Sequence, residues 1–113
     1  MTLDIRLRLG HEWTFEDLPE RSIALDGAVQ GPRIDAETQR FSFDHHAGCL
    51  RLVTTATCQQ VFDALLLGLD PTGMQILVND LDGDTVLSMW LMEHHRRWRD
   101  PVQREKVSAL VRL

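Results

Sequence analysis

Apolar and polar residues alternate in the first third of the chain, which predicts short β-strands there. Residues 3–9 (LDIRLRL) alternate between an aliphatic and a charged side chain, as in a strand with one exposed face. An apolar run at 21–29 and an alternating run at 39–44 predict two more strands, either a hairpin or two neighbours in one sheet. Residues 11–20 favour an irregular or briefly helical link, and residues 30–35, with their Gly-Pro pair, a turn.

The second half of the chain changes to a helical period. Residues 54–70 (TTATCQQVFDALLLGLD) repeat apolar residues at i, i+4 and i+8, and Thr55 or Thr57 is suited to cap the start of this helix. The apolar run at 74–78 (MQILV) predicts a buried strand. A second helix is expected to begin at Asp84, with Asp84 itself as N-cap, and to continue through the His-His-Arg-Arg run.

This order of elements predicts an α/β fold. Residues 101–113 begin with a proline in a helix-compatible position and carry a weak apolar stripe, which indicates a last helix. Strand, helix, strand and helix in succession indicate a small, at least partly parallel sheet with flanking helices, and residues 1–113 are expected to form a single α/β domain. Ligands gather beyond the carboxyl ends of such strands, where Asp26, Asp44 and Asp80 fall.

Composition narrows the classes of function. The 113 residues are 43% apolar and 26% charged, which is typical of a folded domain. The net charge of −5 argues against a general nucleic-acid coat, but it is compatible with a small phosphorylated substrate held through metal ions. The two cysteines, Cys49 and Cys58, form no disulfide framework. The chain shows no signal peptide, and its longest apolar run is too short to cross a bilayer, so a cytoplasmic location is expected.

The loop after the buried strand carries three closely spaced carboxylates. Asp80, Asp82 and Asp84 lie at i, i+2 and i+4, where they repel one another unless a cation or backbone N–H groups compensate. Mg²⁺ and Mn²⁺ prefer such oxygen ligands. An EF-hand is excluded, because its Gly and Glu positions hold Thr85 and Leu91. The alternative interpretation is a solvated turn whose last acid caps the next helix.

A second polar cluster, Asp44, His45 and His46, follows the strand predicted at 39–44. Neighbouring side chains of an extended backbone point to opposite sides, so one histidine would face a metal and the other a substrate. The alternative is a strand end with a capping aspartate and two partly exposed histidines. Asp26 is a further candidate ligand or a plain turn acid, and Arg33 a candidate phosphate contact or a solvated arginine.

Both clusters resemble motifs of a known family. F-D-H-H at 43–46 resembles the signature of the DHH phosphoesterase superfamily, which includes RecJ-type exonucleases, family II inorganic pyrophosphatases and small phosphodiesterases. D-L-D-G-D at 80–84 resembles that family's acidic motif, and the resemblance as a whole covers about residues 21–92. It implies a parallel α/β domain in which two Mn²⁺ or Mg²⁺ ions activate water against a phosphorus centre.

The resemblance also implies roles for individual residues. His45 and Asp26 would be metal ligands, together with the acids of the loop: Asp80, Asp82 and Asp84. His46 would contact the substrate phosphate and Asp44 would orient its neighbour, so that both belong to the catalytic group. Arg33 remains the candidate for holding substrate.

The chain departs from the family in two ways. Its acidic motif follows D-H-H, whereas relatives normally have the reverse order, and the motif of their second, substrate-binding domain does not occur in this sequence. A truncated DHH-like domain with a homo-oligomer or a partner subunit supplying the second lobe is therefore expected. The predicted function is hydrolysis of a phosphoester or phosphoanhydride in a small phosphorylated substrate or short oligonucleotide. The alternative is a non-catalytic metal-binding or protein-interaction domain, and no membrane association is expected.

Overall fold

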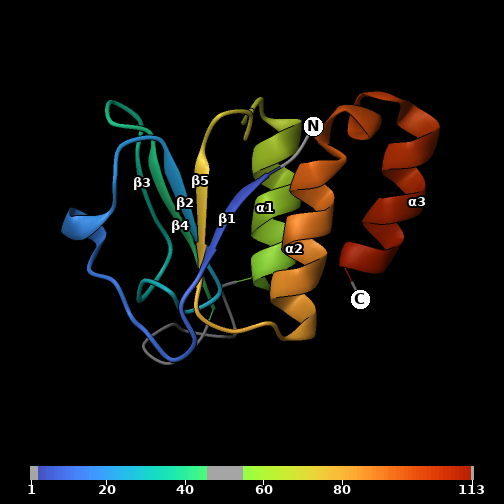
Figure 1. Ribbon diagram of the computed structural model, residues 1–113. Helices are drawn as coiled ribbons and strands as arrows, with labels where there is room; N and C mark the ends of the chain where they lie inside the picture. The colour runs from blue at the N-terminus through green and yellow to red at the C-terminus, as the bar shows by residue number, and fades with distance from the viewer. Residues whose placement is uncertain (1–2, 46–54, 113) are drawn as a thin grey trace.

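The fold is a five-stranded sheet with its helices on one side, as the computed structural model shows for residues 3–45 and 55–112 (Figure 1). The strands are β1 (Asp4–Leu7), β2 (Ser22–Leu25), β3 (Arg33–Asp35), β4 (Arg40–Phe43) and β5 (Gln75–Val78). The helices are α1 (Thr57–Leu66), α2 (Gly83–Glu93) and α3 (Pro101–Val111), with 3₁₀ turns at Phe15–Asp17 and His95–Arg99. None of the helices in these two ranges is both long and apolar enough to cross a bilayer.

The sheet is mostly parallel, which confirms the predicted fold class. Its strand order is β1-β5-β2-β4-β3, and the first four strands run in the same direction. Strands β2 and β4 are therefore parallel neighbours, and the hairpin alternative for them is wrong. The hairpin is instead formed by β4 with antiparallel β3, a segment that the sequence assigned to a turn. The Asp35 carboxylate closes this hairpin, since it accepts hydrogen bonds from Glu37 N and Thr38 Oγ1.

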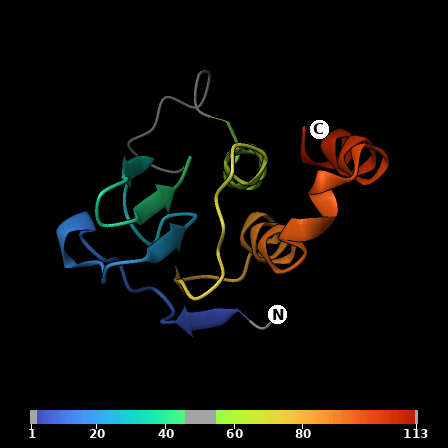
Figure 2. The same ribbon diagram turned by 90° about the horizontal axis from the view of Figure 1, so that it is seen from above.

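Two hydrophobic clusters hold the layers together. Helices α1 and α2 cover one face of the sheet, and α3 lies outside them (Figure 2). The helix-side core includes Ile23, Leu25, Phe43, Ile76 and Val78 from the sheet, with Val61, Phe62, Leu91 and Met92 from α1 and α2. On the opposite face Trp13, Phe15 and Leu18 pack against Ala24 and Leu77. Because β2 and β5 are covered on both faces, they carry apolar side chains at successive positions, which is typical of buried parallel strands.

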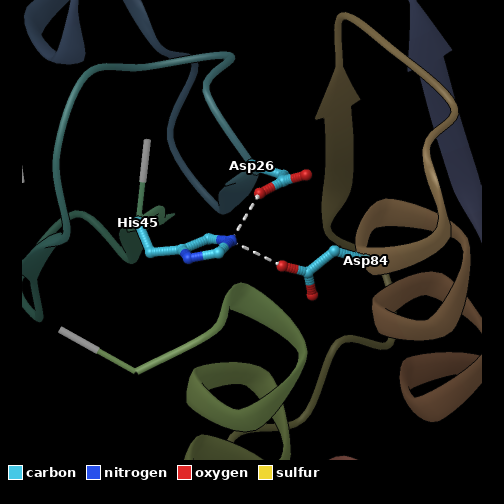
Figure 3. Close-up of side chains that lie close together, drawn as sticks. All are labelled: Asp26, His45 and Asp84. Atoms are coloured by element: carbon cyan, nitrogen blue, oxygen red, sulfur yellow. Dashed lines mark ion pairs between the residues drawn. The ribbon is translucent and has the colours of Figure 1, made fainter. Parts of the chain in front are cut away.

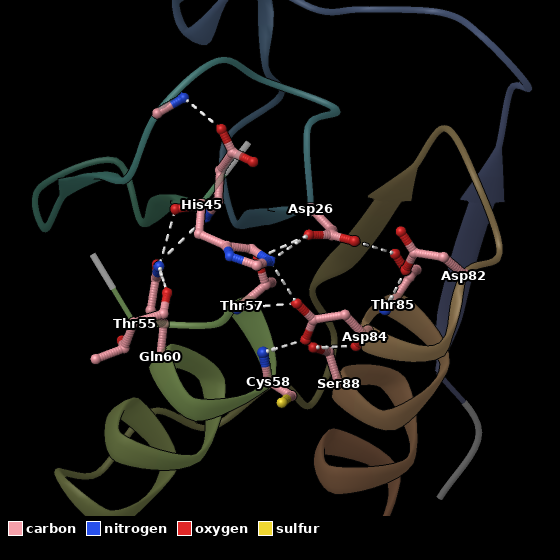
Figure 4. Close-up of polar contacts among 12 residues, drawn as sticks. Asp26, His45, Thr55, Thr57, Cys58, Gln60, Asp82, Asp84, Thr85 and Ser88 are labelled. Carbon is pink, nitrogen blue, oxygen red and sulfur yellow. Dashed lines mark hydrogen bonds and ion pairs between the residues drawn. The ribbon is translucent and has the colours of Figure 1, made fainter. Parts of the chain in front are cut away.

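The start of each of the first two helices differs from the prediction. The N-cap of α1 is Ala56, which has no side chain that can cap, and Thr57 is the first helical residue. The N-cap of α2 is Asp82, whose Oδ1 accepts a hydrogen bond from Thr85 N at 2.9 Å. Asp84 therefore lies inside the first turn of α2, where its side chain points away from its own helix end and toward α1 (Figure 4).

Helix α2 is also shorter than predicted. It ends at Glu93, and the following residues form a separate 3₁₀ turn rather than continuing the helix. The turn places Trp98 in the core, 6.2 Å from the ring of Phe62, with its indole N–H donating to Leu91 O at 3.0 Å. The indole thus satisfies a carbonyl that the ending helix leaves without an intrahelical partner.

Candidate metal centre

The carboxyl ends of β2, β4 and β5 lie side by side, and each is followed by acidic or imidazole side chains. Strand β2 ends in a tight turn in which Ala28 N donates to Leu25 O at 3.2 Å, and Asp26 and Gly27 both have positive φ, 54° and 96°. Asp-Gly is the residue pair typical of such a turn, because both positions need the left-handed region. The turn presents the Asp26 side chain at the same edge as His45 and the start of α2.

Three of the predicted ligands form one group. His45 Nε2 lies 2.9 Å from Asp84 Oδ2 and 3.8 Å from Asp26 Oδ1 (Figure 3). One ligand atom from each of the three side chains can be chosen such that all lie within 4.8 Å of one another. The three residues come from three separate segments, 19 and 39 positions apart in the sequence, so the tertiary fold brings them together.

Asp26 is buried, and its two carboxylate oxygens have different partners. Oδ1 accepts a hydrogen bond from Thr57 Oγ1 at 2.9 Å, and Oδ2 accepts one from Thr85 Oγ1 at 3.1 Å. Asp82 is also hydrogen-bonded to this carboxyl group (Figure 4). Burial raises the pKa of Asp26 to about 6, and the contact with Asp82 and the charge of Asp84 act in the same direction. The group therefore holds a proton to unusually high pH.

Asp84 links the group to helix α1. Its Oδ1 accepts from Cys58 N at 2.7 Å and its Oδ2 from Thr57 N at 3.2 Å, so it binds the first N–H groups of a helix that lacks a capping side chain. The partial positive charge of that helix end favours an anion at this position. Burial and the neighbouring Asp84 raise the pKa of the Cys58 thiol to about 12, despite the helix N-terminus.

Asp44 does not belong to the group of three. Its buried carboxylate accepts a hydrogen bond from Gly31 N at 2.8 Å, in the loop between β2 and β3. Gln60 of α1 binds the backbone of Asp44 on both sides, with Oε1 accepting from its N–H and Nε2 donating to its carbonyl. Asp44 and Gln60 therefore fix the main chain from which His45 projects.

The remaining predicted site residues lie at other places. Asp80 is exposed, and its carboxylate accepts from Leu81 N at 2.8 Å; it lines a pocket of about 480 Å³ together with Asp26 and Asp82. Arg33 pairs with Glu16 at 3.0 Å and covers the ring of Phe15, rather than joining the acidic group. His46, the predicted phosphate contact, lies outside the described residues.

Two threonines of the site were missed by sequence reasoning. The sequence pattern favours Thr57 only as a helix cap and gives Thr85 no role in the site, yet both are fully buried donors to Asp26. Each lies in the first turn of a helix that begins at the acidic edge, and that shared position is the signal that points to them. A hydroxyl in the buried first turn next to a strand-end acid is expected to donate to it.

Known proteins give no information about the chemistry of this site. No protein-family model, curated protein or solved structure matches the chain. The donor set consists of carboxylate oxygens and one imidazole nitrogen, which suits Mg²⁺, Mn²⁺ or a similar divalent ion. Thr57, Thr85 and the α1 N-terminus orient the acids from behind, as groups around metal ligands commonly do.

Proposed function

We propose that Asp26, His45 and Asp84 bind a divalent metal ion, Mn²⁺ or Mg²⁺, and that the chain is a metal-dependent phosphohydrolase-like domain. The observation that supports this proposal is the convergence of three ligand atoms from three chain segments within 4.8 Å. A resemblance of two short motifs to the DHH phosphoesterases adds the reaction class, hydrolysis of a phosphoester or phosphoanhydride.

The spacing of these atoms is compatible with an octahedral ion. Ligands at about 2.1 Å from such an ion are about 3.0 Å apart when adjacent and about 4.2 Å apart when opposite. His45 Nε2 lies 2.9 Å from one carboxylate and 3.8 Å from the other. Small rotations of the side chains would therefore accommodate an ion between the imidazole and the two carboxylates.

Asp26 is suited to bridge a first and a second ion. Its Oδ1 lies toward His45, whereas its Oδ2 receives Thr85 and its carboxyl group also contacts Asp82 (Figure 4). Asp82 and Asp80 line the adjoining pocket, where a second ion would find carboxylate oxygens. His45 and Asp84 would hold a first ion and Asp82 and Asp80 a second, with Asp26 available to both.

The chain's own residues would hold the metal ligands in place and supply the negative charge that binds the ions. Bound ions of this kind make hydroxide available at neutral pH and neutralise the charge that develops on phosphate oxygens. Thr57 and Thr85 hold the bridging carboxylate, and the N-terminus of α1 holds Asp84. Because the site is acidic, a phosphorylated substrate is attracted only after metal has bound, which favours a small substrate or a short oligonucleotide held mainly through the ions.

A second candidate function is metal binding without turnover. It is favoured by Arg33, the predicted phosphate contact, which is already paired with Glu16 and stacked on Phe15. Small phosphate sites usually recruit such a guanidinium. Under this alternative the ion would stabilise the edge of the sheet.

Titration calorimetry with Mn²⁺ tests the metal site. The intact chain is expected to bind with micromolar or tighter affinity. His45→Ala removes one ligand and Asp84→Asn removes the negative charge of another, so each should weaken binding by at least about tenfold. Asp84→Asn keeps an oxygen that can accept from Cys58 N, so the shorter of its two hydrogen bonds to the start of α1 is conserved. Asp17→Asn, an exposed acid of a 3₁₀ turn, is the matched control and should bind like the wild type.

Asp80→Asn separates one ion from two. If a second ion binds, this variant should lose the weaker of two binding events and keep the first. Hydrolysis of bis-p-nitrophenyl phosphate and of pyrophosphate by the Mn²⁺-loaded chain then tests turnover. Binding without hydrolysis would support the second candidate, and binding that is weak and indifferent to His45→Ala would contradict both.

A further inference from the structure

The outer edge of β1 is the most exposed strand edge of the sheet. Strand β1 is terminal in the strand order, and within the described residues its only strand partner is β5 (Figure 2). All four of its residues are exposed, including Ile5 and Leu7, with exposed fractions of 43% and 42%. An open edge with apolar side chains is a template for pairing with another strand.

The backbone of β1 has its free hydrogen-bonding groups at alternate residues. Arg8 N donates to Val78 O at 3.0 Å, so the even-numbered residues turn their N–H and C=O groups toward β5. Leu3, Ile5 and Leu7 therefore turn theirs toward the open edge. A partner strand would bond to these three residues without displacing any bond between β1 and β5.

The side chains of β1 are arranged symmetrically about Ile5. On one face Leu3, Ile5 and Leu7 follow one another, and Leu3 already packs against the helix-side core. On the other face Asp4 precedes Ile5 and Arg6 follows it, and the two charges are exposed and pair within the strand at 3.0 Å. A strand with this pattern matches a copy of itself that runs in the opposite direction.

We propose that two copies of this chain pair through β1, antiparallel and with Ile5 opposite Ile5, and so form a continuous ten-stranded sheet. In this register Leu3 lies opposite Leu7, which extends one apolar strip across the junction. Asp4 of each copy lies opposite Arg6 of the other, at the narrow, non-hydrogen-bonded positions where cross-strand side chains are closest.

The charges select this register from its neighbours. Shifting the pairing by one residue places apolar side chains opposite charged ones on both faces. The next shift in one direction puts Arg6 opposite Arg6, and in the other direction Asp4 opposite Asp4, and like charges at facing positions are destabilising. Only when Ile5 lies on the two-fold axis do Asp4 and Arg6 face opposite charges alone while the apolar strip stays continuous.

The other sheet edge is less suited to such pairing. Strand β3 has three residues, and the charge of Arg33 is already engaged by Glu16. The β1 dimer also leaves the candidate metal centre unchanged, since the antiparallel arrangement puts the two carboxyl edges at opposite ends. Pairing through β1 is therefore independent of the proposed function.

Sedimentation equilibrium of the full chain tests the proposal. We expect a concentration-dependent increase from the 13.0 kDa of the chain to twice that mass. Asp4→Arg alone and Arg6→Asp alone should each be monomeric, because both cross-strand pairs then become like-charged. Arg99→Asp, an exposed charge reversal in the 3₁₀ turn after α2, should dimerise like the wild type.

Two complementary samples make the test specific to this register. The double variant Asp4→Arg with Arg6→Asp should regain the dimer, since the opposite charges are only exchanged. An equimolar mixture of the two single variants should form the heterodimer, because each copy then offers the charges that the other lacks. Circular dichroism confirms that each variant is folded, which is expected for exposed positions.

A wild-type monomer at all concentrations would overturn the proposal and leave the edge to a strand of another protein. A dimer that Arg6→Asp does not weaken, or monomeric variants that do not recover on mixing, would overturn the β1 register. Metal binding and hydrolysis are measured separately, so a failed metal site has no bearing on these results.

Discussion

Helices α1 and α2 start side by side at the same acidic edge, yet their first N–H groups are satisfied in different ways. Helix α2 is capped by Asp82, whose carboxylate accepts a hydrogen bond from the N–H of Thr85, three residues further along the chain. Helix α1 has Ala56 at its N-cap and receives the carboxylate of Asp84, which lies more than 25 positions further along the chain. A local cap stabilises one helix, whereas a borrowed one ties two helices together.

The borrowed cap explains why Asp84 is placed as a ligand. One oxygen of its carboxylate faces Cys58 N, while the other is shared between Thr57 N and His45 Nε2. The helix end thus fixes the orientation of a carboxylate that also faces His45. Asp26 lies between the two helix starts and accepts a hydroxyl hydrogen bond from the first turn of each.

The largest expected effect comes from pH in the metal-free protein. The raised pKa of Asp26, from 3.8 to about 6, means that the folded state keeps a proton which the unfolded state releases above about pH 4. The contribution of Asp26 to the free energy of unfolding is fully present below about pH 4 and is lost as the pH rises through about 6. At 1.36 kcal/mol per pKa unit, the loss amounts to at most about 3 kcal/mol. Urea unfolding in EDTA between pH 4 and 7 measures it.

Asp26→Asn is the control for this pH dependence. The amide cannot ionise, so the decrease in the free energy of unfolding between pH 4 and 7 should flatten in this variant. An unchanged slope of the free energy of unfolding against pH would show that groups other than Asp26 cause the pH dependence.

Removing the borrowed cap should cost more than removing the local one. Asp84→Ala leaves two N–H groups of α1 without their acceptor and His45 without its closest partner, for an expected loss of about 2 kcal/mol. Asp82→Ala should cost about 1 kcal/mol or less, because the lost cap is partly offset by relief of its contact with Asp26. Equal losses in thermal unfolding at pH 7 would mean that the two helix starts are equivalent.

The hydroxyl from α1 is expected to matter next. Thr57→Val keeps the shape of the side chain but removes the donor to Asp26 Oδ1, for a loss of about 1 kcal/mol. Since the Thr57 hydrogen bond lowers the pKa of Asp26, the pKa of that carboxyl should rise further in the variant. NMR titration of the carboxyl carbon measures the pKa, and an unchanged value would show that the bond is not maintained in solution.

The smallest effect concerns the thiol at the start of α1. A helix N-terminus usually activates a cysteine, but burial and Asp84 raise the pKa of Cys58 to about 12. In a Cys49→Ser background, the native protein should therefore react with a disulfide reagent at pH 8 far more slowly than the urea-unfolded chain. Asp84→Asn should accelerate the reaction modestly, and a fast reaction in the wild type would contradict the burial of this thiol.

Much of this arrangement follows from short-range pattern. Alternation and period identified four of the five strands and the three helices, and the order of elements indicated a parallel sheet. Parallel strands place their carboxyl ends at one edge, so the proximity of Asp26, His45 and the loop acids is expected once 21–29 and 39–44 are neighbours rather than a hairpin, a choice that the sequence left open. Strand β3 was not predicted, because three residues after a Gly-Pro pair are too few to show a periodic pattern of apolar residues.

Only the tertiary structure decided which acid does what. The sequence favours Asp84 as the helix cap among the three loop acids, but in the structure Asp80 is exposed, Asp82 caps its own helix, and Asp84 reaches the neighbouring helix and His45. The direction of a side chain in a loop depends on the N–H and hydroxyl groups that other segments bring within reach. Here the N–H groups of Thr57 and Cys58 bind Asp84. These donors lie far from Asp84 in the sequence, so the local sequence around Asp84 does not specify them.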